Sequence, residues 1–215
     1  MIGCGLLVPF AAQAAAFAPG DLLDRAIAAM GGREQLARIK ALRWTGQARV
    51  ETGDTTLRLE VETRVEPFLR AQSRSWLSGK PETARTLIIE PDGGFVERGG
   101  ARTPLPARQV LHERQQYGLY GYMLLTRAPT RVEGGGLTAH RSDLPPVHFL
   151  LEGDHLAAAD YTVASPDSDG TIAQRFLFEG EQPDKGVHWP HTITIRQNDK
   201  PYFILDIESF SVELA

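Results

Sequence analysis

Residues 42–66 read LRWTGQARVETGDTTLRLEVETRVE, and this stretch decides the fold class. On either side of its centre, apolar or small residues alternate with charged or polar ones. A period of two is typical of a β-strand with one buried face and one solvated face. Thr52-Gly53-Asp54 lie between the two halves and have turn-forming side chains. The stretch therefore predicts an antiparallel hairpin with strands over 42–51 and 57–66.

Further strand-like segments extend this hairpin into a long antiparallel meander. Turn residues separate the segments, at 91–94, 152–154, 165–170 and 198–200. The additional strands are expected at 68–77, 85–90, 95–97, 147–151, 155–163, 171–179, 188–196 and 202–214. In the last strand the apolar residues change parity after Ile207, which predicts a β-bulge near Glu208.

Three segments have helical spacing instead. The first begins at Asp21, which can cap it, and ends at Gly31-Gly32. A second piece runs from Arg33 to Lys40, and a third runs from Pro106 to Thr126. Residues 127–146 contain a glycine triplet and two adjacent prolines, so they are expected to form a loop within the same domain.

A long sheet with one apolar face must bury that face, and few helices are present to cover it. The predicted fold is therefore α+β, with a curled antiparallel sheet, a half-open β-barrel, wrapped around covering helices. Residues 19–215 are expected to form this one domain, because a chain of 215 residues has room for one substantial core.

Curled sheets of this kind leave an apolar hollow between sheet and helix, which is a natural ligand site. Its expected lining comes from the alternating strands and from the helix over 106–126. The candidate ligand-binding residues are Trp44, Leu57, Leu59, Val61, Val65, Tyr117 and Leu124. Trp44 and the tyrosines at 117, 120 and 122 are also residue types that build ordinary cores, so core and cavity lining both remain open for them.

Composition excludes two classes of protein. The chain has 23 Lys and Arg against 27 Asp and Glu, a net charge of −4, and 42% hydrophobic residues. Mild acidity argues against binding nucleic acid by counterion release, and this hydrophobic content argues against intrinsic disorder.

Motifs for metal binding or catalysis are few. His188 and His191 flank a Pro that prevents helical ligand geometry, and no Cys or carboxylate cluster completes a metal site. Residues 167–170, Asp-Ser-Asp-Gly, resemble part of a calcium loop without its distal Glu, so a turn is predicted there. The sequence has no Gly-x-Ser-x-Gly elbow and no phosphate loop. We therefore expect a protein that is not an enzyme and that has no catalytic residue, metal or cofactor.

Residues 1–18 carry no charge and combine an apolar run with an Ala-rich stretch. This pattern is typical of a secretory signal peptide, here with cleavage after Ala14, Ala16 or Ala18. The positive n-region is missing, so the start codon can lie upstream of Met1. Cys4 precedes the apolar run, whereas a lipobox cysteine follows one, so a lipoprotein is the less favoured alternative. The expected location is the periplasm.

Four segments resemble the LolA/LolB-like family of periplasmic lipoprotein and lipid carriers. They are residues 28–32, 66–70, 91–95 and 186–190, and they span nearly the whole mature chain. The resemblance implies a half-open β-barrel around helices, with an apolar cavity that takes acyl chains. One position departs from the family, because the carriers have an Arg before the strand-opening Pro to tether their lid, and this chain has Glu66. This departure argues against the lid mechanism of the carriers in this chain, and against a function restricted to the transfer of lipoproteins.

Two functions from different classes follow. The first is a monomeric periplasmic protein that holds a lipid, or the acyl chains of a lipid-modified protein, and one form of it is a carrier to the outer membrane. The alternative is a sensory or structural interaction module of the same fold. In that case its own side chains fill the cavity, and a strand edge pairs with an envelope protein. Acyl mass that copurifies with the protein distinguishes the two.

Overall fold

A computed structural model describes residues 19–215, and the expected signal peptide over 1–18 lies outside the described residues. The helices are α1 (Pro19–Ala29), α2 (Arg33–Arg38) and α3 (Ala107–Tyr122). The main sheet contains β1 (Ile39–Thr52), β2 (Thr55–Glu66), β3 (Arg70–Leu77), β4 (Lys80–Glu90), β5 (Gly93–Arg98), β6 (Ala101–Pro104), β7 (Thr130–Glu133), β8 (Gly136–Arg141), β9 (Leu144–Glu152), β10 (His155–Ala164), β11 (Thr171–Glu179), β14 (Thr192–Gln197) and β15 (Lys200–Leu214). A separate hairpin consists of β12 (Gln182–Asp184) and β13 (Val187–Trp189).

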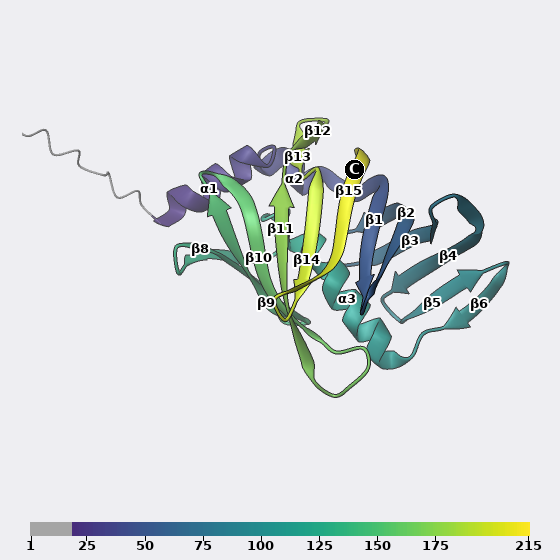
Figure 1. Ribbon diagram of the computed structural model, residues 1–215. Helices are drawn as coiled ribbons and strands as arrows, with labels where there is room; N and C mark the ends of the chain where they lie inside the picture. Colours follow the sequence, from purple (N-terminus) through teal and green to yellow (C-terminus); the bar gives the residue numbers. More distant parts are fainter. Residues whose placement is uncertain (1–18) are drawn as a thin grey trace, which may run out of the picture.

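The main sheet has 13 antiparallel strands in the order β6-β5-β4-β3-β2-β1-β15-β14-β11-β10-β9-β8-β7. Helix α3 contacts β2, β4 and β5 in one half of the sheet and β9 and β10 in the other half. One helix can reach both halves because the sheet curls around it, as Figure 1 shows. The predicted fold class, an open curled antiparallel sheet with covering helices, is confirmed.

The hairpin predicted over 42–66 is present as β1 and β2. Leu42 pairs with Val65, and Val50 pairs with Leu57. The predicted bulge is also confirmed, because β15 pairs Ser209 with Thr45 and Ile207 with Gly46, which leaves Glu208 as the extra residue. The apolar residues on both sides of the bulge therefore face the interior.

The structure corrects three sequence-based expectations. The expected loop over 127–146 contains β7, β8 and the start of β9, because Gly134 and Gly135, with φ of 58° and 79°, form the tight turn of a short hairpin. The helix expected to reach Thr126 ends at Tyr122. The strand expected over 188–196 is two strands, because Pro190 has no N–H to donate and interrupts the ladder.

Gly46 lies beside the bulge, where β1 and β15 approach closely. A Cβ at this position would be 2.2 Å from the carbonyl oxygen of Asp206, which is backbone and cannot move without disturbing the pairing. We expect Gly46→Ala to lower the free energy of unfolding by about 1–3 kcal/mol in urea denaturation. Gly93→Ala is the control, because a Cβ at Gly93 meets nothing within 4 Å. Equal losses in both variants would contradict the close approach at Gly46.

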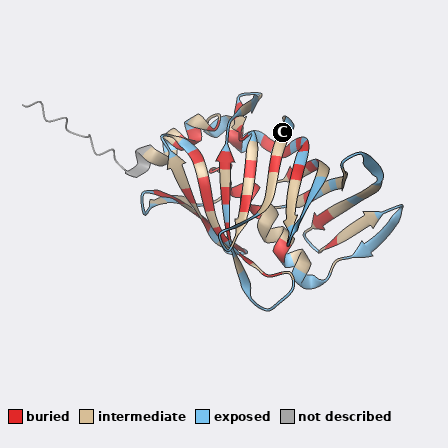
Figure 2. Ribbon diagram, in the orientation of Figure 1, coloured by how far each residue is buried: buried red, intermediate tan, exposed pale blue. Residues whose placement is uncertain are grey.

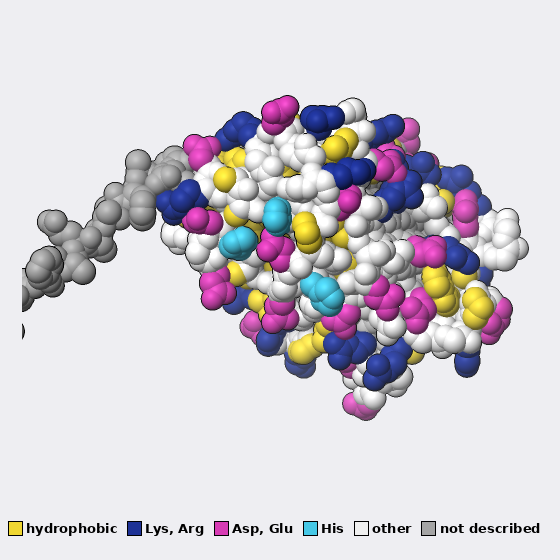
Figure 3. Space-filling model, turned by 90° about the horizontal axis from the view of Figure 1, so that it is seen from above, with side chains coloured by type: hydrophobic (Ala, Val, Ile, Leu, Met, Phe, Trp, Pro, Cys, Tyr) yellow, Lys and Arg dark blue, Asp and Glu magenta, His cyan; other side chains and the backbone are white. Residues whose placement is uncertain are grey.

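One end of the curled sheet is covered by α1, α2 and the β12–β13 hairpin (Figure 1). The backbone N–H of His188 donates to the carbonyl of Met30 at 3.1 Å, and Lys185 Nζ donates to the carbonyl of Val212 at 2.7 Å. Figure 3 looks down on this end and shows charged side chains of both signs, with hydrophobic side chains in small separate patches. Among the described helices, none has the length and apolar character needed to cross a bilayer.

The core lies between the concave face of the sheet and the helices. Buried residues recur along the central strands in Figure 2. Next to the covering hairpin, Trp189 stacks on Phe210 with ring centroids 5.4 Å apart. Trp44 extends this group, with its ring 4.9 Å from Tyr120 and 6.5 Å from Trp189. These rings fill the covered end of the curled sheet.

Candidate ligand-binding site

A cavity of about 190 Å³ lies between the concave face of the sheet and α3. One side of it, the apolar wall, comes from β1, β2 and β15 and includes Trp44, Val50, Leu59, Val61, Phe203 and Leu205. The rest of the lining, the polar wall, comes mainly from β3 and β4, which continue the same face of the sheet beyond β2, and from α3, which packs over that face. Its polar side chains include Ser73, Ser75, Arg85, Glu113, Gln116 and Tyr117. The cavity is thus amphipathic.

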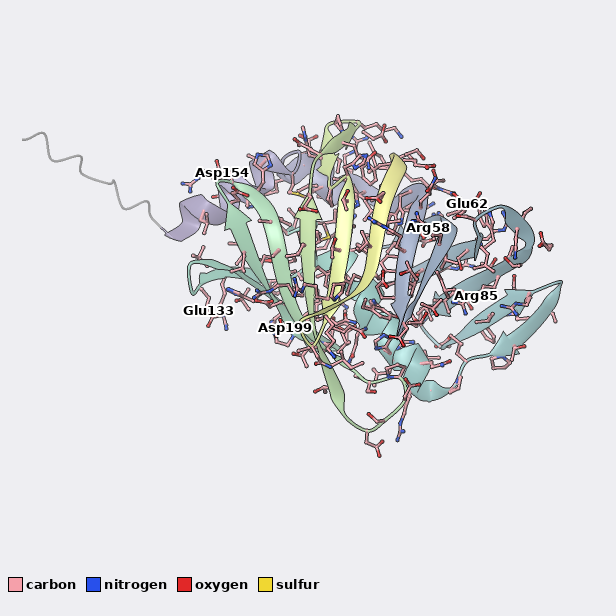
Figure 4. All side chains as sticks on the ribbon, in the orientation of Figure 1. Arg58, Glu62, Arg85, Glu133, Asp154 and Asp199 are labelled. Carbon is pink, nitrogen blue, oxygen red and sulfur yellow. The ribbon has the colours of Figure 1, made fainter. Side chains whose placement is uncertain are left out.

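The exposure of the lining residues changes along the cavity. Trp44 and Tyr120 are buried, Leu59 and Tyr202 are half-buried, and Arg85 is exposed. Arg85 projects from β4 and is labelled in Figure 4. The cavity therefore opens toward Arg85 and ends at the aromatic group beside β13.

Four of the seven ligand-binding residues predicted from the sequence lie together in this cavity. Trp44, Leu59, Val61 and Tyr117 all line the cavity. Val65 lines a second cavity of about 140 Å³, which Tyr117 also borders.

The two remaining candidates lie elsewhere. Leu57 is one inner position beyond Leu59 on β2 and is 38% exposed. Leu124 is fully buried in the core and follows α3 in a turn. The helix therefore presents Tyr117 to the cavity, whereas Leu124 lies beyond the end of that helix.

Of the polar wall, sequence reasoning identified Tyr117 alone. Ser73 and Ser75 alternate with Gln72 and Arg74, so β3 resembles a strand that is polar on both faces, yet only the two serines face the cavity. The position of Glu113 could have been predicted from the sequence, because Glu113 is four residues before Tyr117 and therefore lies on the same face of the helix.

Burial determines the electrostatics of the polar wall. It raises the pKa of the Glu113 carboxyl, and the neighbouring His112 and Arg85 side chains oppose that shift. Burial also raises the pKa values of the Tyr117 and Tyr120 hydroxyls, and the Glu113 carboxylate raises both values further. Both hydroxyls are therefore neutral hydrogen-bond donors at neutral pH.

The Tyr117 hydroxyl is fixed by neighbours on the sheet. It hydrogen-bonds the side chain of Ser73. Ser73 Oγ also lies 2.8 Å from Thr63 Oγ1, on the adjacent strand. This contact holds the tyrosine ring between the two cavities, both of which it lines.

Glu66 occupies the position at which the sequence departs from the carriers. It accepts a hydrogen bond from Arg64 and lines the second cavity. Arg64 Nη2 also donates to Glu213 at 2.7 Å. Together with Arg43, it holds the pKa of the Glu213 carboxyl at about 2. Glu66 thus belongs to an ion-pair network that joins β2 to β15.

The side chain of His188 and the turn that contains residues 167–170 make contacts within the protein. His188 pairs with Glu181, and the backbone N–H of Ser165 donates to the carbonyl of Gly170 at 2.9 Å across the turn over 165–170. Over residues 19–215, no group of three or more His, Cys, Asp or Glu side chains is arranged to hold a metal ion.

No family model matches the sequence, and no curated protein matches it. Solved structures do match the fold. A LolA superfamily protein from Nitrosomonas europaea has a TM-score of 0.57 at 9% identity, covering 93% of this chain and 96% of that one. A DUF1329 family protein from Desulfovibrio piger has a TM-score of 0.55 at 9% identity, covering 90% and 92% of the two chains. A Vibrio parahaemolyticus domain named for outer membrane lipoprotein sorting has a TM-score of 0.52 at 8% identity, covering 88% and 92%. The LolA-like fold implied by the sequence resemblance is confirmed.

Proposed function

We propose that this chain is a periplasmic binding protein that holds the acyl chain of a lipid or of a lipid-modified protein. The observation that carries the proposal is the apolar wall of the larger cavity. Its residues come from adjacent strands, and their exposure increases from buried Trp44 to half-buried Leu59 toward the mouth. A hydrocarbon chain inserted along this wall would leave water for an apolar surface, which is favourable by about 0.8 kcal/mol per buried methylene.

Solved structures with a similar fold support this proposal. One is a LolA superfamily protein, and another is named for lipoprotein sorting at the outer membrane. The apolar N-terminal segment supports export. Binding requires no catalytic group, metal or cofactor, and we propose none. Transport of the bound lipid to the outer membrane is the carrier form of the same function.

An interaction module is the second candidate, and the edge of the sheet favours it. Strand β6 is an edge strand, and all of its residues are exposed. Such an edge offers unpaired backbone groups to a strand from a partner protein. In this reading an envelope protein is the partner, and the cavity is only a packing defect.

Native mass spectrometry of protein extracted gently from the periplasm tests the first candidate against the second. The expected spectrum shows a protein that begins between Ala15 and Pro19 and carries additional mass of a lipid or acylated ligand. The control is the same protein after denaturation, extraction with organic solvent and refolding, which should lose the extra mass and regain it when lipid is added. A bare chain before and after lipid addition would reject the binding function and favour the interaction module.

A further inference from the structure

The polar wall forms a stripe from the mouth of the cavity to its middle. The polar stripe consists of the six side chains of the polar wall, Arg85, Ser75, Ser73, Glu113, Gln116 and Tyr117. A hydrocarbon chain cannot hydrogen-bond to these groups, and their desolvation by such a chain would cost free energy. An acyl chain therefore accounts for the apolar wall of the cavity and leaves the stripe without a role.

The two charges of the stripe are without close partners. In the described part of the chain, neither the Arg85 nor the Glu113 side chain has a hydrogen bond or an ion pair, although both line the same cavity. Most of the other described arginines have a side-chain partner, for example Arg175 Nε with Asp160 Oδ1 at 2.6 Å. A cation and an anion that face one cavity without bonding each other are both available to a ligand.

Arg85 and Glu113 line one cavity together with Tyr117 and Tyr202, so the two charges lie near the same hydroxyls. Burial is the main cause that raises the pKa of both Tyr117 and Tyr202; the Glu113 carboxylate adds to that shift, and the Arg85 guanidinium opposes it. Both charges therefore act on the same pair of hydroxyls. Arg85 is exposed at the mouth, whereas Glu113 is half-buried on α3, so the cation lies on the outer side of the site.

We propose, building on the lipid-binding function above, that the polar stripe recognises a lipid with a zwitterionic headgroup. The anionic group of the headgroup, a phosphate, binds the Arg85 guanidinium, whose planar fork matches phosphate oxygens. The ammonium group binds Glu113, with the Gln116 amide oxygen as a further acceptor for its three hydrogens. The acyl chain follows the apolar wall. A purely anionic headgroup would leave Glu113 without a cation, and an uncharged headgroup would leave both charges unpaired.

Competition among matched lysolipids tests this assignment. The full mature protein is loaded with a fluorescent fatty-acid probe, and three competitors with the same short acyl chain are added below their micelle concentrations. They are lysophosphatidylethanolamine, lysophosphatidylglycerol and a monoacylglycerol. We expect the ethanolamine lipid to displace the probe at about tenfold lower concentration than either of the others, because a charge-assisted hydrogen bond contributes roughly that factor. Free phosphoethanolamine should not displace the probe, since it lacks the chain.

Two variants test which residue binds the ammonium group of the headgroup and which binds the phosphate. Glu113→Gln should abolish the preference for the ethanolamine lipid over the glycerol lipid, and Arg85→Gln should abolish the advantage of phosphate-bearing lipids over the monoacylglycerol. Arg58→Gln is the matched control, because Arg58 is an exposed arginine on β2, labelled in Figure 4, and does not line the cavity. It should leave the ranking unchanged.

The possible outcomes separate this inference from the function on which it rests. If the wild-type protein binds all three lysolipids equally well, the headgroup assignment is wrong and lipid binding stands. A ranking that survives in both Glu113→Gln and Arg85→Gln also overturns the assignment. Failure of the wild type to bind the probe and every lysolipid overturns lipid binding and the headgroup assignment together.

Discussion

Leu124→Asp is expected to lower the free energy of unfolding by about 4 kcal/mol or more. Leu124 is fully buried in the turn that follows α3, among the residues of the hydrophobic core. The substitution removes a packed side chain and introduces a carboxyl group that must be buried without a partner or protonated. Because small domains are stable by only about 5–15 kcal/mol, this single change is expected to remove a large part of the stability.

Urea denaturation followed by circular dichroism measures the loss, and Leu57→Asp is the matched control. Leu57 is the same residue type at an exposed position, so its replacement should cost less than about 1 kcal/mol. A fluorescent dye that binds apolar surface provides a second readout, since loosening of the turn beneath α3 exposes core residues. An unchanged free energy of unfolding together with unchanged dye binding would show that Leu124 does not anchor this turn in the core.

The central hairpin could be predicted from the sequence because its alternation is strict. A shift of one residue would move every apolar side chain to the wrong face, so only one register satisfies residues 42–66. The same reasoning located the bulge at Glu208, where the apolar residues of β15 change parity.

The strands at the far edge of the sheet could not be predicted in this way. Strands β7 and β8 have four and six residues, too few for a period to be recognised, and the glycines between them resemble a loop. The end of α3 was misplaced for a related reason. Leu124 keeps helical spacing with Tyr117, but the backbone leaves the helix at Tyr122, and Leu125 has a φ of 56°.

The candidate site was predictable on its apolar side and, in the polar wall, at Tyr117 alone. Trp44, Leu59 and Val61 were identified because a half-buried strand shows which side chains face inward. Ser73 and Glu113 were missed because each is polar and would be equally at home on the surface. Ser73 faces the cavity because β3 pairs with β2 on the concave face, and Glu113 faces it because the sheet curls around α3. That juxtaposition depends on contacts between distant segments and leaves no local pattern in the chain.

Leu59→Gln is expected to weaken the uptake of a fluorescent fatty acid by about tenfold. Leu59 lies half-buried on the apolar wall, between the buried inner residues and the mouth. An amide at this position removes apolar surface from the path of the chain and places a polar group there that hydrocarbon cannot satisfy. A cost of about 1.4 kcal/mol in binding corresponds to the tenfold change.

Glu60→Gln provides the internal control, because neighbouring residues on a strand face opposite sides of the sheet. The Glu60 carboxylate accepts a hydrogen bond from Ser78 Oγ at 2.9 Å and does not line the cavity. Titration of each purified variant with the probe, after circular dichroism has shown that it is folded, should give wild-type affinity for Glu60→Gln and reduced affinity for Leu59→Gln. A folded Leu59→Gln protein with full uptake would remove β2 from the binding site. Absence of uptake by the wild-type protein would instead favour the interaction module, in which the exposed edge at β6 becomes the functional surface.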